Sequence, residues 1–139
     1  KVLALLSIIS LSFLIQTLVA LLMIIMVVNN TVNWNHLFEM HLNGYVLCLF
    51  FAAIGVVFSQ LLKGVKNYMG LVVGVVMGTY FLHGIGSAVD DANWIAKFSP
   101  FHYLGVDEFH PLALLVFSIL SLVFIVLGFR VFDRKDIGA

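Results

Sequence analysis

The stretch VLALLSIISLSFLIQTLVALLMIIMVV (residues 2–28) contains no Asp, Glu, Lys or Arg. A helix needs about 20 mostly apolar residues to cross the hydrocarbon core of a membrane, and this run exceeds that length. The run is continuously apolar, whereas strands of a membrane barrel alternate between apolar and polar residues. We therefore predict a spanning helix over Val2–Val28 that tilts or extends beyond the bilayer.

The rest of the chain repeats this pattern three times. The whole chain is 63% hydrophobic and 10% charged, whereas an ordinary soluble domain is about 45–50% apolar and about 25% charged. A soluble fold of this size exposes too much of its surface to hide so many apolar side chains. We predict an all-α integral membrane protein in which residues 1–139 form a single transmembrane domain. The three further predicted spans are Gly44–Leu62, Tyr68–Val89 and Leu112–Phe129.

The basic residues predict the orientation of the chain, because Lys and Arg in short loops stay on the cytoplasmic side. If the four spans alternate in direction, six of the seven basic residues lie on one side and only Lys97 lies on the other. We therefore expect both ends of the chain in the cytoplasm. The residues on the expected cytoplasmic side are Lys1, Lys63, Lys66, Arg130, Arg134 and Lys135.

The first expected external segment, residues 29–43, has an amphipathic pattern. Its larger apolar side chains recur at helical spacing, opposite Asn, His and Glu residues. A short helix of this kind lies in the headgroup layer of a membrane. We predict one interfacial helix here, with the apolar residues Trp34, Leu37, Phe38 and Leu42 facing the lipid.

The second expected external segment, residues 93–111, holds both prolines of the chain and is here named the cap segment. It begins with the apolar spacing of a short helix, for which Asp90 or Asp91 is the expected N-cap. That helix must stop at Ser99, since the residue before a proline is pushed toward an extended conformation. Non-helical backbone at membrane depth is tolerated only where protein or water surrounds it, so we expect a structured cap that packs on the bundle. Its predicted anchoring residues are Trp94, Phe98, Pro100, Phe101 and Tyr103.

Three features together resemble the C-terminal half of a type-2 ABC transporter permease: the short external helix carrying Trp94, the motif FSPFHY (residues 98–103), and the span ending FRVFDRKDI (residues 129–137). Such permeases have six spans, and the resemblance covers the whole chain as spans three to six. It implies that the chain begins part-way through a longer protein. It also implies a location in the bacterial plasma membrane.

The resemblance implies partners as well. The chain would pair with a second permease subunit, as a homodimer or heterodimer, and with ABC ATPase subunits that bind ATP and Mg²⁺. Lys63 and Lys66 are candidates for a cytoplasmic contact. The chain has no G-x-x-x-x-G-K-[ST] motif to cradle phosphates, so we expect a transport subunit without a cofactor or ATPase site of its own.

A strip of small residues runs along the third predicted span. Gly70, Gly74 and Gly78 form two overlapping G-x-x-x-G motifs, which allow a neighbouring helix to approach closely. The partner is either a helix of the same chain or a second permease subunit. The resemblance favours the second subunit, because the corresponding span lies near the subunit interface.

The candidate pathway residues lie on two spans: Gln16 and Thr17 on the first, Tyr80 and His83 on the third. An ionisable group inside a span is a functional candidate by default, and this applies to His83. The competing interpretations are helix packing for the first pair and a neutral His83 satisfied by a backbone carbonyl. We expect no catalytic residues, because no nucleophile has a base at an activating spacing.

We expect no metal site, because the spacing of His102, Asp107, Glu108 and His110 matches no supported motif. We expect no nucleic-acid binding, because no basic patch is interleaved with aromatic residues.

The leading hypothesis is export of an amphiphilic or hydrophobic compound, such as a peptide, a drug or a lipid-like molecule, since the predicted spans offer an ionic substrate no partner. One alternative is a membrane assembly or anchor protein without transport activity. Another is a four-helix proton-coupled exporter, which requires a carboxylate inside the membrane. None of the four predicted spans has one.

Overall fold

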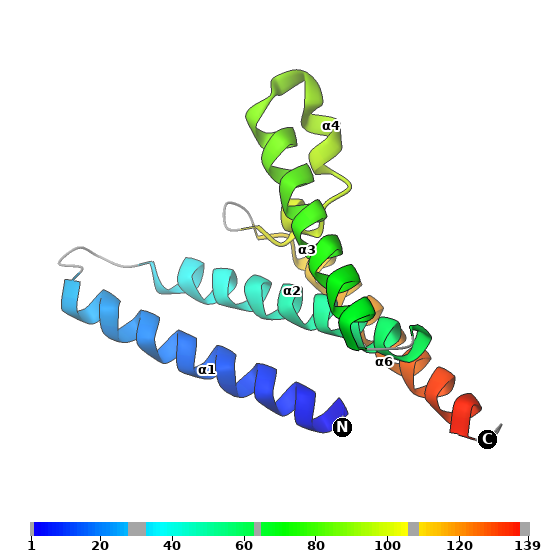
Figure 1. Ribbon diagram of the computed structural model, residues 1–139. Coiled ribbons are helices and arrows are strands. Elements are labelled where there is room, and N and C mark those ends of the chain that lie inside the picture. Colours follow the sequence, from blue (N-terminus) through cyan, green and yellow to red (C-terminus); the bar gives the residue numbers. More distant parts are fainter. Residues whose placement is uncertain (1, 28–32, 63–64, 106–108, 137–139) are drawn as a thin grey trace.

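Four long helices make up most of the protein in the computed structural model, which describes residues 2–27, 33–62, 65–105 and 109–136 (Figure 1). Each of the four is long and apolar enough to cross a membrane. The prediction of an all-α membrane fold with four spans is confirmed. The long helices are α1 (Val2–Val27), α2 (Trp34–Leu61), α3 (Val65–Ala88) and α6 (Pro111–Asp136).

The second span begins ten residues earlier than predicted, at Trp34 rather than Gly44. The part of residues 29–43 that the structure describes is therefore the beginning of α2, and the prediction of a separate interfacial helix there is wrong. Asn33 caps the helix, since its side chain accepts a hydrogen bond from the backbone nitrogen of His36 at 3.3 Å. The helix continues through the polar residue Asn43, whose side chain is buried within the protein.

The core lies along one stripe of α2, formed by Val46, Phe50, Ala53 and Val56. Phe50 meets Phe117 of α6 edge-to-face, with ring centroids 5.0 Å apart. A Cβ atom added at Gly128 would lie 2.7 Å from Cγ1 of Val56, so the backbone of α6 rests directly on α2. Residue numbers rise together along this contact, which makes α2 and α6 parallel. Alternating spans predict the same direction for the second and fourth.

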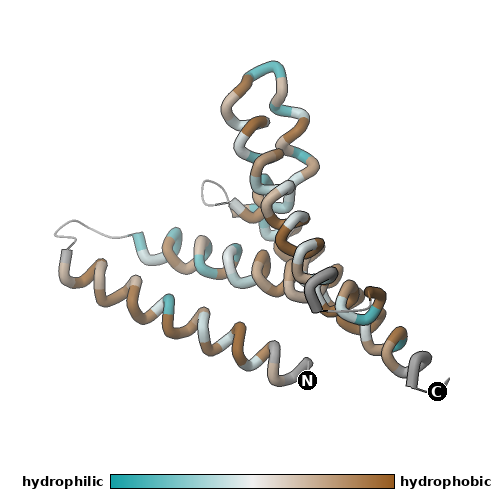
Figure 2. The backbone as a smooth tube through the Cα atoms, viewed as in Figure 1, coloured by the Kyte–Doolittle hydropathy of each residue, from teal (hydrophilic) through white to brown (hydrophobic). Residues whose placement is uncertain are grey.

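The first helix, α1, packs on α2 in the opposite direction. The ring of Phe13 lies 5.3 Å from that of Tyr45, and the hydroxyls of Ser10 and Tyr45 form a hydrogen bond of 2.8 Å. Its other large side chains are mostly exposed, and brown predominates along it in Figure 2, interrupted by a few white and teal residues. An apolar surface of this kind suits contact with lipid.

The third helix, α3, approaches α2 near Gly55 and Val72 and diverges from it toward the end of α3 (Figure 1). A Cβ atom added at Gly70, Gly74 or Gly78 would meet nothing within 4 Å. The glycine strip is therefore not covered by the other described helices. Its pairing with a second subunit stays a prediction.

Candidate functional site

The cap segment connects the region at the end of α3 to α6 and contacts both α2 and α3. It follows the 3₁₀ helix η1 (Asp90–Ala92) and contains two single-turn helices, α4 (Asn93–Ala96) and α5 (Pro100–Tyr103). Figure 2 shows hydrophilic residues gathered at the top of the view, where η1 and α4 lie. The one short helix that was predicted before Ser99 is present as α4, whereas α5 was not predicted.

The predicted break at Ser99 is confirmed. Its backbone is extended, with φ −100° and ψ 132°, as expected of a residue before proline. Pro100 then opens a second helical turn, where its missing N–H costs nothing. The predicted capping by Asp90 or Asp91 is wrong, because both belong to η1 and neither η1 nor α4 has a side-chain cap.

Two contacts fix the cap segment to α3. The Ser99 hydroxyl donates to the backbone oxygen of Thr79 at 2.7 Å, and Ser99 is only 1% exposed. Two turns beyond, a Cβ atom added at Gly86 would overlap the backbone nitrogen of Ala96 and lie 2.9 Å from its Cα. Glycine is needed at this position because two backbones meet there.

Further contacts fix the cap segment to α2. The side-chain nitrogen of Asn43 donates to the backbone oxygen of Gly105 at 3.0 Å. The ring of Phe101 lies between those of Phe51 on α2 and Tyr80 on α3, with centroids 5.6 Å from each. The cap segment is therefore held on both spans, as predicted.

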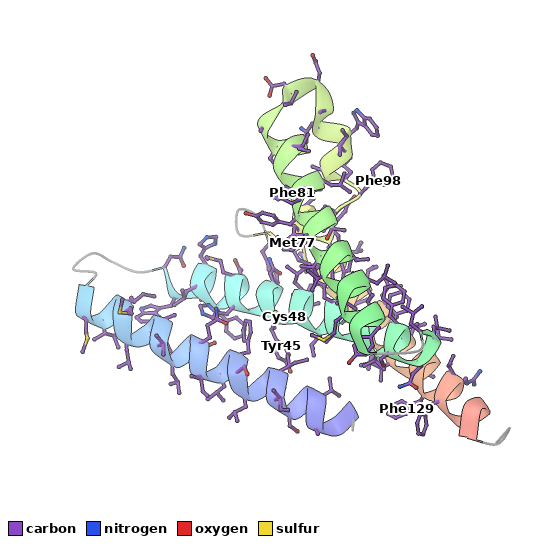
Figure 3. All side chains as sticks on the ribbon, in the orientation of Figure 1. Tyr45, Cys48, Met77, Phe81, Phe98 and Phe129 are labelled. Carbon is purple, nitrogen blue, oxygen red and sulfur yellow. The ribbon has the colours of Figure 1, made fainter. Side chains whose placement is uncertain are left out.

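The four predicted aromatic anchors divide into two pairs. Phe101 and Tyr103 face inward, and the Tyr103 ring lies 6.3 Å from that of Phe117 on α6. Trp94 and Phe98 are 61% and 71% exposed and contact each other, and Phe98 projects away from the long helices (Figure 3). In a bilayer, Trp94 and Phe98 can contact the membrane–water interface. Phe101 and Tyr103 pack on protein.

A cavity of about 630 Å³ lies beneath the cap segment. It brings together two of the predicted pathway residues, Tyr80 and His83, and places them beside the predicted cap residue Phe101. The lining residues come from α2 (Met40, Gly44, Leu47), from α3 (Tyr80, His83, Ser87) and from the segment that joins α3 to α6 (Asn93, Phe101, His102, Leu104, Gly105, His110).

One interpretation of His83 was a ring that is hydrogen-bonded to a backbone carbonyl, and the structure does not show this bond at Nδ1. Its Nδ1 atom is buried and has no hydrogen-bond partner. Its ring faces that of His102, with centroids 6.3 Å apart. Ser87 and His102 were not predicted as pathway residues. Ser87 follows His83 by four residues, the spacing of one helical face, and this signal is visible in the sequence.

The other two predicted pathway residues lie elsewhere. Thr17 donates to the backbone oxygen of Phe13 at 2.8 Å and lines a separate groove of about 410 Å³ between α1 and α2. Gln16 is exposed on α1. The structure therefore does not bring the four pathway candidates into one site.

The structure describes only part of the candidate cytoplasmic contact and of the residues considered for a metal site. Lys63 lies outside the described residues, and for Lys66 only its place in the first turn of α3 is described. The described residues contain no group of three or more His, Cys, Asp and Glu side chains that could hold a metal ion. Asp107 and Glu108 lie outside that description.

No protein-family model, curated protein or solved structure matches the chain. Its identity therefore rests on its own residues and geometry. These show a small all-α membrane protein with four spans and a cap segment anchored above a partly polar cavity.

Proposed function

We propose that this chain is the permease subunit of a type-2 ABC exporter, which moves an amphiphilic or hydrophobic compound out of the cell. Candidate cargoes are a peptide, a drug or a lipid-like molecule. The observation that carries the proposal is the cavity of about 630 Å³ beneath an anchored cap segment. A transporter needs a space that accepts its cargo and an element that closes this space on one side, and the cavity and the cap segment are our candidates for these two parts.

In the proposed orientation the cap segment faces the outside, and both ends of the chain face the cytoplasm of a bacterial cell. The distribution of basic residues supports this orientation, with Lys97 alone on the cap side. The turn containing Lys63 and Lys66 would then face the ATPase subunits. ATP and Mg²⁺ would bind in those subunits.

The uncovered glycine strip on α3 supports pairing with a second permease subunit. A Cβ atom at Gly70, Gly74 or Gly78 would meet nothing within 4 Å, so the strip is open to a helix from another chain. Close approach of two such helices gains dispersion contacts without a large hydrophobic term. The partner is either a copy of this chain or a related permease.

The alternative of a proton-coupled exporter depends on a carboxylate within a span. Because α2 begins at Trp34, it includes Glu39. This is the one Asp or Glu within the four described apolar spans, which are Leu6–Met26, Trp34–Leu61, Tyr68–Ala88 and Pro111–Phe132. Glu39 lies in the second turn of α2, close to the helix end. A carboxylate at this position is expected in the headgroup region and not at the centre of the membrane. We therefore favour the ATP-driven exporter over the proton-coupled one.

The test is isolation of the full-length, affinity-tagged protein from its native membrane in mild detergent. We expect an ATP-hydrolysing subunit to co-purify with it, and we expect ATP-dependent uptake of a hydrophobic dye into inside-out vesicles. A matched preparation carrying Gly128→Leu, which disturbs the contact between α2 and α6, serves as the folding-defective control. Isolation without any ATPase, together with dye uptake that is independent of ATP, would overturn the proposal.

A further inference from the structure

We propose that the cavity beneath the cap segment binds an uncharged amphiphile, whose hydrogen-bond acceptor meets His83 and Tyr80 and whose apolar part lies on Phe101 and Leu47. The assignment of this cavity as a stopping point for exported cargo rests on the proposed function. Binding itself does not, because it requires only this chain.

The size and composition of the cavity suit a small molecule. Its volume of about 630 Å³ lies within the range of about 300–1,000 Å³ that is usual for ligand pockets. The grooves of about 360 Å³ and about 410 Å³ elsewhere in the bundle have mainly apolar linings. The cavity beneath the cap segment combines apolar walls with a concentration of imidazole, hydroxyl and amide groups.

The environment of His83 determines what its ring presents to the cavity. Either single-proton form of the ring leaves the buried Nδ1 atom without a partner, as an orphaned donor or as an orphaned acceptor. Orphaned buried N–H groups are the rarer of the two in proteins, so we place the proton on Nε2. Since His83 lines the cavity, Nε2–H is the hydrogen-bond donor that it offers to a ligand.

A second donor lies on the same face of α3. Tyr80 precedes His83 by three residues, and both side chains line the cavity. The imidazole of His102 stands opposite, at 6.3 Å between ring centroids. A carbonyl oxygen of an amide or ester can accept from His83 or Tyr80, while an adjoining hydrocarbon or aromatic group packs on the apolar wall.

The described residues of the lining offer an ion no opposite charge. No Asp, Glu, Lys or Arg is among them. A charged ligand would lose hydration there and gain no opposite charge from these residues, which is costly in a desolvated site. An uncharged amide or ester avoids this cost and still satisfies the donors.

The experiment uses three probes that share one aromatic ring and differ in charge: N-acetylphenylalaninamide (neutral), N-acetylphenylalanine (anionic) and phenylalaninamide (cationic). The full protein carries Cys48→Ala and Ser87→Cys, which places a thiol in the cavity by changing one atom. Its reaction rate with N-ethylmaleimide is measured in membrane vesicles without ATP. A matched variant carries Lys97→Cys instead, at an exposed position of the cap segment outside the cavity lining.

We expect the neutral probe to slow labelling of the Ser87→Cys protein, by about twofold at a concentration equal to its Kd. The charged probes should have much weaker effects, and the Lys97→Cys protein should be unaffected. Adding His83→Phe should abolish protection because it keeps a ring but removes the donor. His83→Gln should restore part of it, since its amide nitrogen can donate, and His36→Phe on the exposed start of α2 should change nothing.

Equal protection by all three probes, preference for either ion, or full protection in the His83→Phe protein would overturn the inference. Unchanged hydrogen–deuterium exchange at the Phe98 and Ser99 amides shows that a variant retains the folded cap. Export failure with intact probe binding would count against the proposed function alone. ATP-driven export without probe binding would count against the cavity assignment alone.

Discussion

Replacing Gly86 by alanine tests whether the cap segment is held on α3 by direct backbone contact. A Cβ atom at this position would lie 2.7 Å from the Cβ of Ala96 and 2.9 Å from its Cα, and it would overlap the Ala96 backbone nitrogen. The obstacle is largely backbone, so no side-chain rotation relieves it. We expect Gly86→Ala to push α4 away from α3.

The expected size of the effect follows from the cost of inserting a methyl group into a packed site, about 1–3 kcal/mol. At about 1.4 kcal/mol per tenfold change, this raises the population with a detached cap by about 5- to 150-fold. The matched control is Gly84→Ala on the same helix, where an added Cβ meets nothing within 4 Å. Both changes raise helix propensity alike, so only the contact with Ala96 distinguishes them.

Hydrogen–deuterium exchange in lipid nanodiscs measures this opening. The amides of Phe98 and Ser99 donate to Ile95 at 3.2 Å and to Ala96 at 2.9 Å, and they exchange when the cap turn opens. We expect exchange about 5- to 150-fold faster in Gly86→Ala and unchanged in Gly84→Ala. Equal exchange in the two variants would refute the view that close approach at Gly86 holds the cap segment.

Three further predictions concern packing, assembly and topology. Gly128→Leu should separate α6 from α2 and lower the unfolding temperature in detergent, because an added Cβ already comes within 2.7 Å of a neighbouring side chain; an unchanged temperature would contradict this packing. Gly74→Leu should leave that temperature unchanged but weaken crosslinking between permease subunits, and undiminished crosslinking would remove the strip from the subunit interface. In a Cys48→Ala background, a cysteine at Lys97 should react with a membrane-impermeant thiol reagent in intact cells while one at Lys66 should not, and the reverse labelling would invert the topology.

The four spans were predictable because each depends on a local property of the chain. An uncharged apolar run of about 20 residues has few options besides a membrane helix. The break at Ser99 was predictable for the same reason, since the neighbouring Pro100 restricts it directly. The spans and the break could be inferred from the sequence because each depends on residues close together in the chain.

The start of α2 was missed because its cause is not local. The polar residues of 33–43 have the pattern of an interfacial helix, and nothing nearby indicates that Asn43 points into the protein. Its hydrogen-bond partner, Gly105, is 62 residues away along the chain. The role of Gly86 was hidden for the same reason, because Ala96 reaches it only after the chain reverses direction.

The pathway candidates show that polarity within a span does not by itself identify the residues that share a site. Intramembrane polarity selected Tyr80 and His83, which share one face of α3 and line the cavity, but it also selected Gln16 and Thr17, which do not. A Thr in a membrane helix can bond to its own backbone, as Thr17 does with Phe13. His83 has no such partner at Nδ1. The buried nitrogen without a local acceptor is therefore what separates a candidate site from a polar residue that its own helix already satisfies.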